Sequence, residues 1–264
     1  MYAYDLIFIL DLVTCVLAGL VLGSFSTVLI HRMPRHESIL GRKPSTCPEC
    51  KTQLKWRSMW PVFSWVFQKG RCLNCEAPIS RTYPLAEGMC LILSLCFYAA
   101  YGHNLITVAM ILTTPVLTAM LFIDLKHMII PDRLNLSLGF LSLAALGAYA
   151  WNQPLHMVET AFLQMLAGGV MFFVVALILA YGVSFALKKQ ALGGGDIKFF
   201  AAAGLWLGPM GLPLFMFLGG LFGVVMAVAM RGRSDDGAFP FAPSLILALI
   251  LLLVFKQHVF LTIL

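Results

Sequence analysis

Three aspartates stand beside long apolar runs, where carboxylates are rare. Asp124 lies near the end of one run, Asp132 follows a proline, and Asp196 follows three consecutive glycines. A carboxylate at the edge of hydrocarbon is costly to keep charged, so such residues are functional candidates by default. Two carboxylates held close together can share one proton. The ionised one takes a proton from water as the water attacks a peptide carbonyl, and the protonated one donates to the carbonyl oxygen. We predict that Asp124 and Asp196 form such a pair.

Each aspartate also has a simpler explanation. Asp124 could form a surface ion pair with Lys126 or Arg133. Asp132 stands where a helix should begin, and we interpret it as an N-cap. Asp196 could cap a helix as well, but capping alone does not require three glycines in front of it.

The segment Gly193-Gly194-Gly195 permits positive φ and a close approach of another backbone. A substrate strand or a second carboxylate packed against this turn would need that freedom. We therefore predict that Gly193 and Gly195 shape the site or contact a substrate. Lys198 could orient Asp196 or bind substrate, and it could equally extend its charge to the membrane surface.

Four of the seven cysteines form two pairs, Cys47-Pro-Glu-Cys50 and Cys72-Leu-Asn-Cys75. This spacing is typical of a zinc site with four thiolate ligands. Two disulfides or a redox pair are the alternatives. The topology derived below places the segment on the reducing side of a membrane, where structural disulfides are rare. We predict a structural zinc, because four thiolates leave no open position and a small domain needs a metal to stabilise it.

The composition indicates a membrane protein. Of the 264 residues, 60% are hydrophobic and 11% are charged, and the mean hydropathy is +0.89. Ordinary soluble domains are about 25% charged. A disordered chain is excluded, and a soluble enzyme of this length is disfavoured. The net charge of +6 reflects the sidedness of a membrane protein rather than binding to nucleic acid.

The apolar runs predict an all-α polytopic membrane protein with seven to eight transmembrane helices. We expect a first helix within residues 1–30, a small cytoplasmic zinc-binding domain at 31–83, and a membrane-embedded peptidase domain at 84–264. Within the last part, helices are predicted at about 84–101, 105–123, 133–151, 158–187, 197–208, 211–230 and 242–262. The 197–208 run is too short for an ordinary span, since a span needs about 20 residues.

The basic residues predict the orientation. If residues 31–83 lie in the cytoplasm, every Lys and Arg except Lys256 falls on the cytoplasmic side. This asymmetry matches the positive-inside rule and places the N-terminus outside.

These features together resemble the prepilin peptidase family, the GxGD-type aspartic proteases of bacterial inner membranes. The segment 193–198 matches its G-x-G-D-x-K motif, and Asp124 through Asp132 matches the segment with its other catalytic aspartate. The cysteine pairs match its cytoplasmic zinc domain. Two further segments of the chain resemble family segments. The first is Gly23-Ser24-Phe25 together with residues 30–34, and the second is residues 239–243. Two departures stand out: Ser26-Thr27 replaces a Leu-Asn pair, and Ala242 replaces a glycine.

The resemblance implies cleavage of the short basic leader from type IV prepilins and pseudopilins at the cytoplasmic membrane interface. It also implies N-methylation of the new N-terminus with S-adenosylmethionine, although no glycine-rich fingerprint for that cofactor is visible in 31–83. Two other functions compete with this one. A proton-coupled transporter would also use intramembrane aspartates, but it should show internal repeats, and we find none. A zinc-bearing scaffold of a pilus or secretion system would need no chemistry.

Overall fold

The fold was examined in a computed structural model that describes residues 2–39, 45–151, 153–187, 192–231 and 240–259. Within these ranges the regular elements are helices, and two isolated β-bridges occur in the cysteine-bearing segment. The α-helices are α1 (Tyr2–Arg32), α2 (Phe63–Phe67), α3 (Thr82–Tyr101), α4 (Leu105–His127), α5 (Asp132–Ala150), α6 (Leu155–Leu187), α7 (Gly194–Leu207), α8 (Leu212–Ala229) and α9 (Ala242–Val259). The predicted all-helical class is confirmed.

Five stretches of the described chain are long and apolar enough to cross a membrane: Leu6–Arg35, Thr82–Tyr101, Leu105–His127, Leu155–Gly182 and Pro209–Ala229. They correspond to α1, α3, α4, most of α6, and α8. The apolar described part of α9 is shorter, and α7 has only 14 residues. The short helix expected at 197–208 is therefore present, whereas the count of seven to eight spans stays a prediction.

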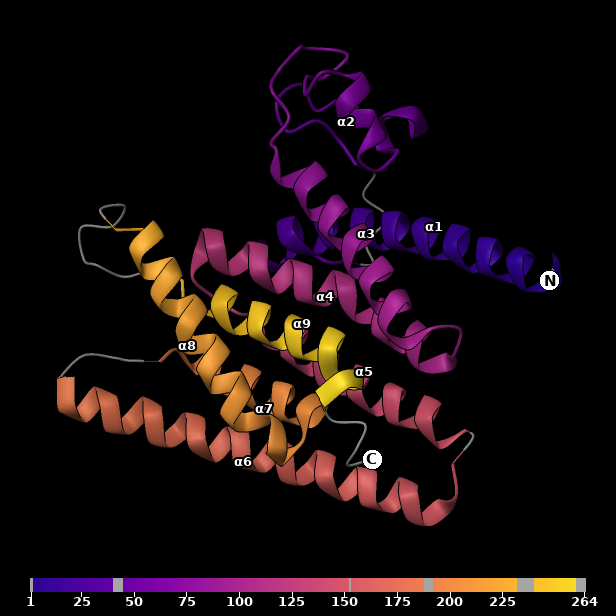
Figure 1. Ribbon diagram of the computed structural model, residues 1–264. Coiled ribbons are helices and arrows are strands. Elements are labelled where there is room, and N and C mark those ends of the chain that lie inside the picture. Colours follow the sequence, from indigo (N-terminus) through magenta and orange to yellow (C-terminus); the bar gives the residue numbers. More distant parts are fainter. Residues whose placement is uncertain (1, 40–44, 152, 188–191, 232–239, 260–264) are drawn as a thin grey trace.

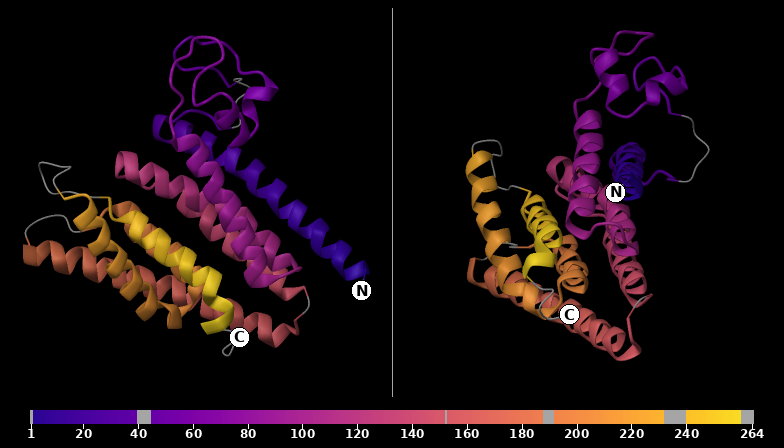
Figure 2. Two further views of the ribbon diagram at one scale, coloured as in Figure 1. Left: turned by 45° about the horizontal axis from the view of Figure 1, so that its top comes forward. Right: turned by 45° about the vertical axis from the view of Figure 1, so that its right-hand side comes forward.

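Helix α4 lies at the centre of the bundle. It packs against α1 and α3 on one side and against α5 and α9 on the other, and α6 pairs with α7 beyond them (Figures 1 and 2). Of the residues in the most apolar stretch of α4, 78% are buried, whereas 17 to 33% are buried in the corresponding stretches of the other four spans. The remaining spans thus expose apolar side chains that only lipid can cover.

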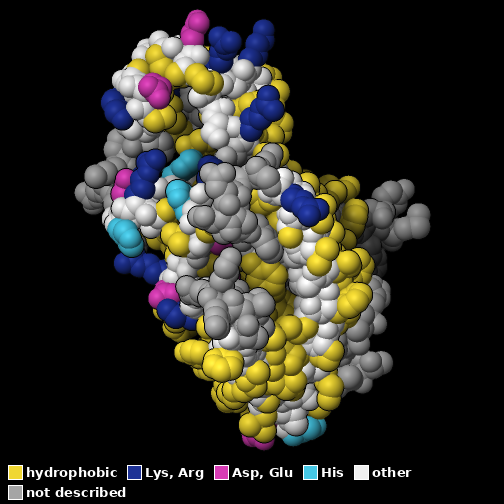
Figure 3. Space-filling model, turned by 90° about the vertical axis from the view of Figure 1, so that its left-hand side faces the viewer, with side chains coloured by type: hydrophobic (Ala, Val, Ile, Leu, Met, Phe, Trp, Pro, Cys, Tyr) yellow, Lys and Arg dark blue, Asp and Glu magenta, His cyan; other side chains and the backbone are white. Residues whose placement is uncertain are grey.

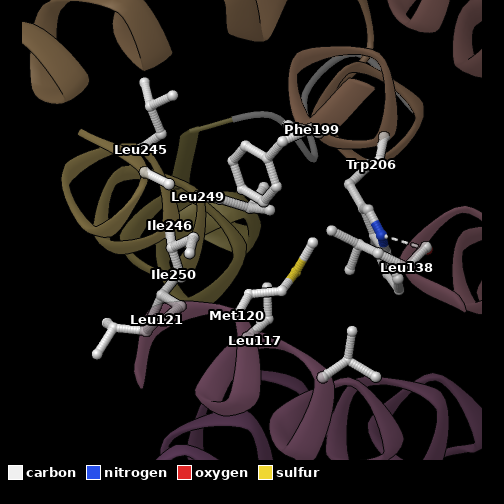
Figure 4. Close-up of a cluster of buried hydrophobic side chains, with 14 of the residues drawn as sticks. Leu117, Met120, Leu121, Leu138, Phe199, Trp206, Leu245, Ile246, Leu249 and Ile250 are labelled. Atoms are coloured by element: carbon white, nitrogen blue, oxygen red, sulfur yellow. Dashed lines mark hydrogen bonds between the residues drawn. The ribbon is translucent and has the colours of Figure 1, made fainter. Parts of the chain in front are cut away.

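The core between α4, α7 and α9 fixes the helices that carry the aspartates. Met120 of α4 faces Phe199 of α7 and Leu249 of α9 in a dense cluster (Figure 4). The indole N–H of Trp206 in α7 donates to the carbonyl oxygen of Leu138 in α5 at 3.0 Å. Because a buried indole N–H needs a partner, this bond also fixes the rotation of α7 against α5.

Glycines allow two pairs of helices to touch through their backbones. Gly168 of α6 meets Gly204 of α7 so closely that a methyl group on either one would overlap the backbone of the other. Gly19 and Gly23 of α1 contact the backbone of α3 in the same way. Small residues at such crossings are typical of membrane helices, where close packing replaces the hydrophobic effect as the source of association.

We expect Gly168→Ala to destabilise the protein by about 1–3 kcal/mol, because the added methyl group must separate α6 from α7. Gly147→Ala in α5 is the matched control, since no neighbouring atom lies within 4 Å of its added methyl group. The control should gain up to about 1 kcal/mol from helix propensity. Thermal unfolding of both purified proteins in detergent measures the difference, and equal midpoints would contradict the close crossing.

Candidate functional site

The aspartates lie toward one end of the bundle. Figure 3 looks at the molecule from the left-hand side of Figure 1, where α4 ends and α3 begins. Lys and Arg side chains are spread over the cysteine-bearing segment and the region beneath it, while hydrophobic side chains dominate the lower part of the view. Charged groups and the apolar belt are therefore separated along the molecule.

Asp124 occupies the last turn of α4 and is only 4% exposed. The backbone N–H of Ala242, the first residue of α9, hydrogen-bonds to its carboxyl group. Its Oδ2 atom is buried with no hydrogen-bond partner in the described part of the chain. The surface ion pair with Lys126 or Arg133 is thus not what this side chain does. A buried carboxyl oxygen without a partner is costly, and its presence points to a functional reason.

Asp196 is the third residue of α7, and its Oδ2 accepts a hydrogen bond from the backbone N–H of Gly193 at 3.1 Å. The cap considered from the sequence therefore exists. Capping is not the only interaction of Asp196, because its charge also acts on Asp124. The two predicted carboxyl groups, at the end of one helix and at the start of another, thus lie within electrostatic range of each other.

A close contact with Ile130, rather than an unusual backbone conformation, explains why residue 195 is a glycine. Gly193, Gly194 and Gly195 do not adopt positive φ, so that part of the expectation was wrong. A Cβ atom on Gly195 would lie 3.1 Å from both Cβ and the carbonyl oxygen of Ile130. The space beside Gly194, in contrast, is open. The start of α7 is therefore pressed against the link between α4 and α5.

Lys198 connects α7 to α5. Its Nζ lies 2.7 Å from both carboxylate oxygens of Asp132, and both side chains are exposed. The N-cap interpretation of Asp132 was wrong, because α5 begins at Asp132 itself and its side chain makes no capping bond. An exposed ion pair stabilises little. It can still align the starts of the two helices beside the aspartates.

Two residues at this site were missed or undervalued in the sequence. Asn135 of α5 donates from Nδ2 to the carbonyl oxygen of Gly195 at 3.2 Å and so holds the start of α7. Ala242 was noted only as a departure from a family pattern, yet its N–H contacts Asp124. Neither role could be recognised beforehand, since both act through backbone groups. Phe239, at the start of that pattern, lies outside the described residues.

The four paired cysteines form one cluster. The sulfur atoms of Cys47, Cys50, Cys72 and Cys75 all lie within 4.8 Å of one another, and the Cys47 and Cys75 sulfurs are 3.9 Å apart. A tetrahedral zinc with Zn–S bonds of about 2.3 Å places its sulfur ligands about 3.8 Å apart. The cluster therefore fits a zinc ion.

The two cysteine pairs have equivalent backbones. The carbonyl oxygens of Cys47 and Cys72 accept from the N–H groups of Lys51 and Glu76, at 3.0 and 2.9 Å. Both Lys51 and Glu76 have positive φ, and an isolated β-bridge encloses each turn. The segment is thus two copies of one turn, offset by 25 residues.

Local hydrogen bonds favour the thiolate that a metal requires. Bonds from Thr52 and Asn74 lower the pKa of Cys50 to about 6. The Asn74 Nδ2 atom reaches across from the second pair, 3.5 Å from the Cys50 sulfur. Since the thiolate is the ligand form of cysteine, this arrangement favours Cys50 as a metal ligand, whereas contacts with the other cysteines raise the pKa of Cys75.

Comparison with known proteins gives consistent matches along the chain. A family model described as the bacterial peptidase A24 N-terminal domain matches residues 17–101, and one described as the type IV leader peptidase family matches residues 111–228. The chain is 32% identical to a prepilin leader peptidase/N-methyltransferase of Aeromonas salmonicida, covering 88% of this chain and 86% of the relative.

Two further relatives give the same picture. A type 4 prepilin-like proteins leader peptide-processing enzyme of Escherichia coli O78:H11 is 31% identical, over 88% of this chain and 90% of the relative. A prepilin leader peptidase/N-methyltransferase of Legionella pneumophila is 30% identical, over 87% and 86%. No solved structure matches the chain significantly.

We expect the purified protein to carry one zinc ion per chain and the Cys47→Ser/Cys72→Ser variant to lose it. Metal affinity should also fall on acidification, because protons compete for the thiolates. Cys96→Ser, in α3 and outside the cluster, is the matched control and should retain the metal. Elemental analysis measures the zinc content. Full metal retention by the double variant would refute this ligand set.

Proposed function

The chain belongs to the type IV leader peptidase family and is a membrane prepilin peptidase, and we propose that Asp124 and Asp196 together perform its peptide cleavage. The transporter and the non-catalytic scaffold are set aside, because the curated relatives that cover most of the chain carry enzyme names.

The observation that carries the aspartate mechanism is the state of Asp124. Its carboxyl group is buried and leaves one oxygen without a partner, and the charge of a second carboxyl group acts on it. A structural carboxylate would have its oxygens satisfied. Two close carboxyl groups in a region of low dielectric hold one proton between them, and the pair titrates as a unit.

The proposed reaction needs only this pair and water. The ionised carboxylate removes a proton from a water molecule while the oxygen of that water forms a bond to the peptide carbonyl carbon. The protonated carboxyl group gives its proton to the carbonyl oxygen, producing a tetrahedral diol. As the diol collapses, the carboxylate that gave up its proton takes one from a diol hydroxyl, and the other carboxyl group protonates the nitrogen of the breaking C–N bond. A carboxylic acid and an amine are released, and the pair returns to its starting state.

Helix ends support the negative charge of the pair. Asp196 binds the N–H of Gly193 at the start of α7, and Asp124 binds the N–H of Ala242 at the start of α9. The N-terminus of a helix carries a partial positive charge and favours a nearby anion. Two such ends partly compensate for the burial of two carboxyl groups.

The substrate backbone could reach the pair beside the glycines. Gly194 is exposed and has open space where a side chain would stand, while Gly195 is used for packing against Ile130. We propose that Gly193 and Gly194 admit the extended cleavage segment of a prepilin or pseudopilin. Lys198 then acts by aligning α7 through Asp132, which is a positioning role.

We propose that the aspartates and the cysteine cluster face the cytoplasm and that the N-terminus lies outside. The chain is an inner-membrane protein, and a prepilin leader is a basic segment that stays on the cytoplasmic side. The Lys and Arg residues near this end of the bundle support the same orientation (Figure 3). Lys188, Lys189 and Arg233, which were also assigned to this side, lie outside the described residues.

The zinc is proposed as a structural ion. Four thiolates complete its tetrahedral set, so it offers no position to water or substrate. Its contribution is to hold the two equivalent turns together, in a segment of about 50 residues whose own core is small.

N-methylation of the new N-terminus is proposed from the names of the relatives, with S-adenosylmethionine as the methyl donor. The methyl group passes from the sulfonium to the neutral α-amine, and the amine loses one proton. We assign no residue to this step.

Replacing either Asp124 or Asp196 by Asn should lower the rate of prepilin cleavage by about 10²–10⁴-fold or more, because a neutral amide cannot exchange the proton. Glu159→Gln is the control, since this carboxylate is exposed in α6 and has no part in the site. Cleavage of a prepilin in reconstituted membranes, followed by gel electrophoresis, measures the rates. If either catalytic variant cleaved within a few-fold of the wild type, the pair would be misassigned.

Mass spectrometry of the processed pilin tests the second activity. With S-adenosylmethionine present, we expect the new N-terminal peptide to be heavier by one methyl group. Asp124→Asn should block this gain for an uncleaved precursor and leave it intact for a pilin that was cleaved beforehand. An unmodified peptide from the wild-type enzyme would exclude methylation.

A further inference from the structure

The cysteine-bearing segment carries a cluster of large apolar side chains on its surface. We call this cluster the aromatic patch, and it consists of Trp56, Met59, Trp60, Phe63, Val66, Phe67 and Leu73. Their exposed fractions range from 45 to 81%. Five of them line a shallow hollow of about 390 Å³. So many exposed apolar side chains on a small segment indicate a surface that is covered in the working protein.

Helix α2 turns its apolar face outward. The indole N–H of Trp65 donates to the carbonyl oxygen of Ile79 at 3.1 Å, and its ring packs on Gly70 inside the segment. Phe63, Val66 and Phe67 follow the i, i+3, i+4 spacing that puts side chains on one helix face. The segment has therefore filled its own core with Trp65, while Phe63 and Phe67 stay exposed and line the hollow together with Trp56 and Trp60.

The patch begins at the depth of the membrane helices. The N–H of Val62, just before α2, donates to the Glu87 carboxylate of α3 at 2.6 Å. The backbone of Glu87 in turn touches Gly23 of α1. From Leu6 to Gly23, α1 rises about 25 Å, which is most of the roughly 30 Å hydrocarbon core. Val62 is thus anchored close to the boundary between hydrocarbon and headgroups.

The residue types match that boundary. Trp is enriched where hydrocarbon meets headgroups, because its ring is apolar and its N–H can bond to water or lipid. The exposed cations Lys55, Lys69 and Arg71 flank the patch in the sequence. They complement the anionic lipids of a cytoplasmic leaflet.

We propose that the aromatic patch inserts into the headgroup region of the anionic bilayer that surrounds the helices. The cysteine-bearing segment then lies on the membrane surface instead of projecting into water. The hollow accepts the upper part of lipid acyl chains, while the flanking cations contact lipid phosphates. The contact holds the segment beside the end of α4, where prepilins are processed.

The test uses the full enzyme in nanodiscs that contain phosphatidylglycerol and phosphatidylcholine brominated near the headgroup end of its acyl chains. The fluorescence of Trp56 and Trp60 is the difference between the wild type and Trp56→Phe/Trp60→Phe, and that of Trp65 is the difference between the wild type and Trp65→Phe. The bromolipid should quench the first at least about twofold more than the second, because indoles at the interface lie near the bromine atoms. Phe67→Trp adds a reporter at the most exposed position, and its added emission should be quenched as well. Zinc content and prepilin cleavage verify that each variant is folded.

The competing occupant is the prepilin itself. If the fluorescence of Trp56 and Trp60 is not quenched by bromolipid but shifts when a prepilin is added, the proposal is overturned in favour of a substrate groove. Fluorescence that responds to neither bromolipid nor prepilin would also overturn it. Neither result would affect the assignment of the aspartates, because cleavage is measured separately on the same preparations.

Discussion

The carboxyl group of Asp124 is buried at the end of α4, the most enclosed helix of the bundle, and its neighbours must compensate for that burial. Much of the surrounding architecture serves this need. The start of α9 provides a backbone N–H to Asp124, and the start of α7 places Asp196 within electrostatic range of it.

Contacts between α5 and α7 keep these helix ends in register. Trp206 bonds to the backbone of α5, Asn135 bonds to Gly195, and Lys198 pairs with Asp132. All three contacts join α5 to α7: Gly195 and Lys198 lie in the first two turns of α7, and Trp206 lies beside its last residue. The position of Asp196 is therefore set by the whole length of α7 rather than by the glycine turn alone.

The sequence was most informative at residue types that are rare in their surroundings. Carboxylates are rare beside apolar runs, so Asp124 and Asp196 could be singled out, and four cysteines at matched spacing predicted one cluster. Helix positions followed from apolar runs in the same way. The roles of Asn135 and Ala242 were not predictable, because backbone partners are fixed only by tertiary packing. Asp132 was misjudged for a related reason, since its partner Lys198 lies 66 residues away.

The glycine crossings also limit how a membrane-embedded substrate can arrive. Where Gly168 meets Gly204 and where Gly19 and Gly23 meet α3, two helices touch through their backbones, and no third helix can pass between them. At these crossings, the pairs α6–α7 and α1–α3 leave no room for a substrate helix. A pilin helix diffusing in the plane of the bilayer must therefore reach the bundle away from these crossings.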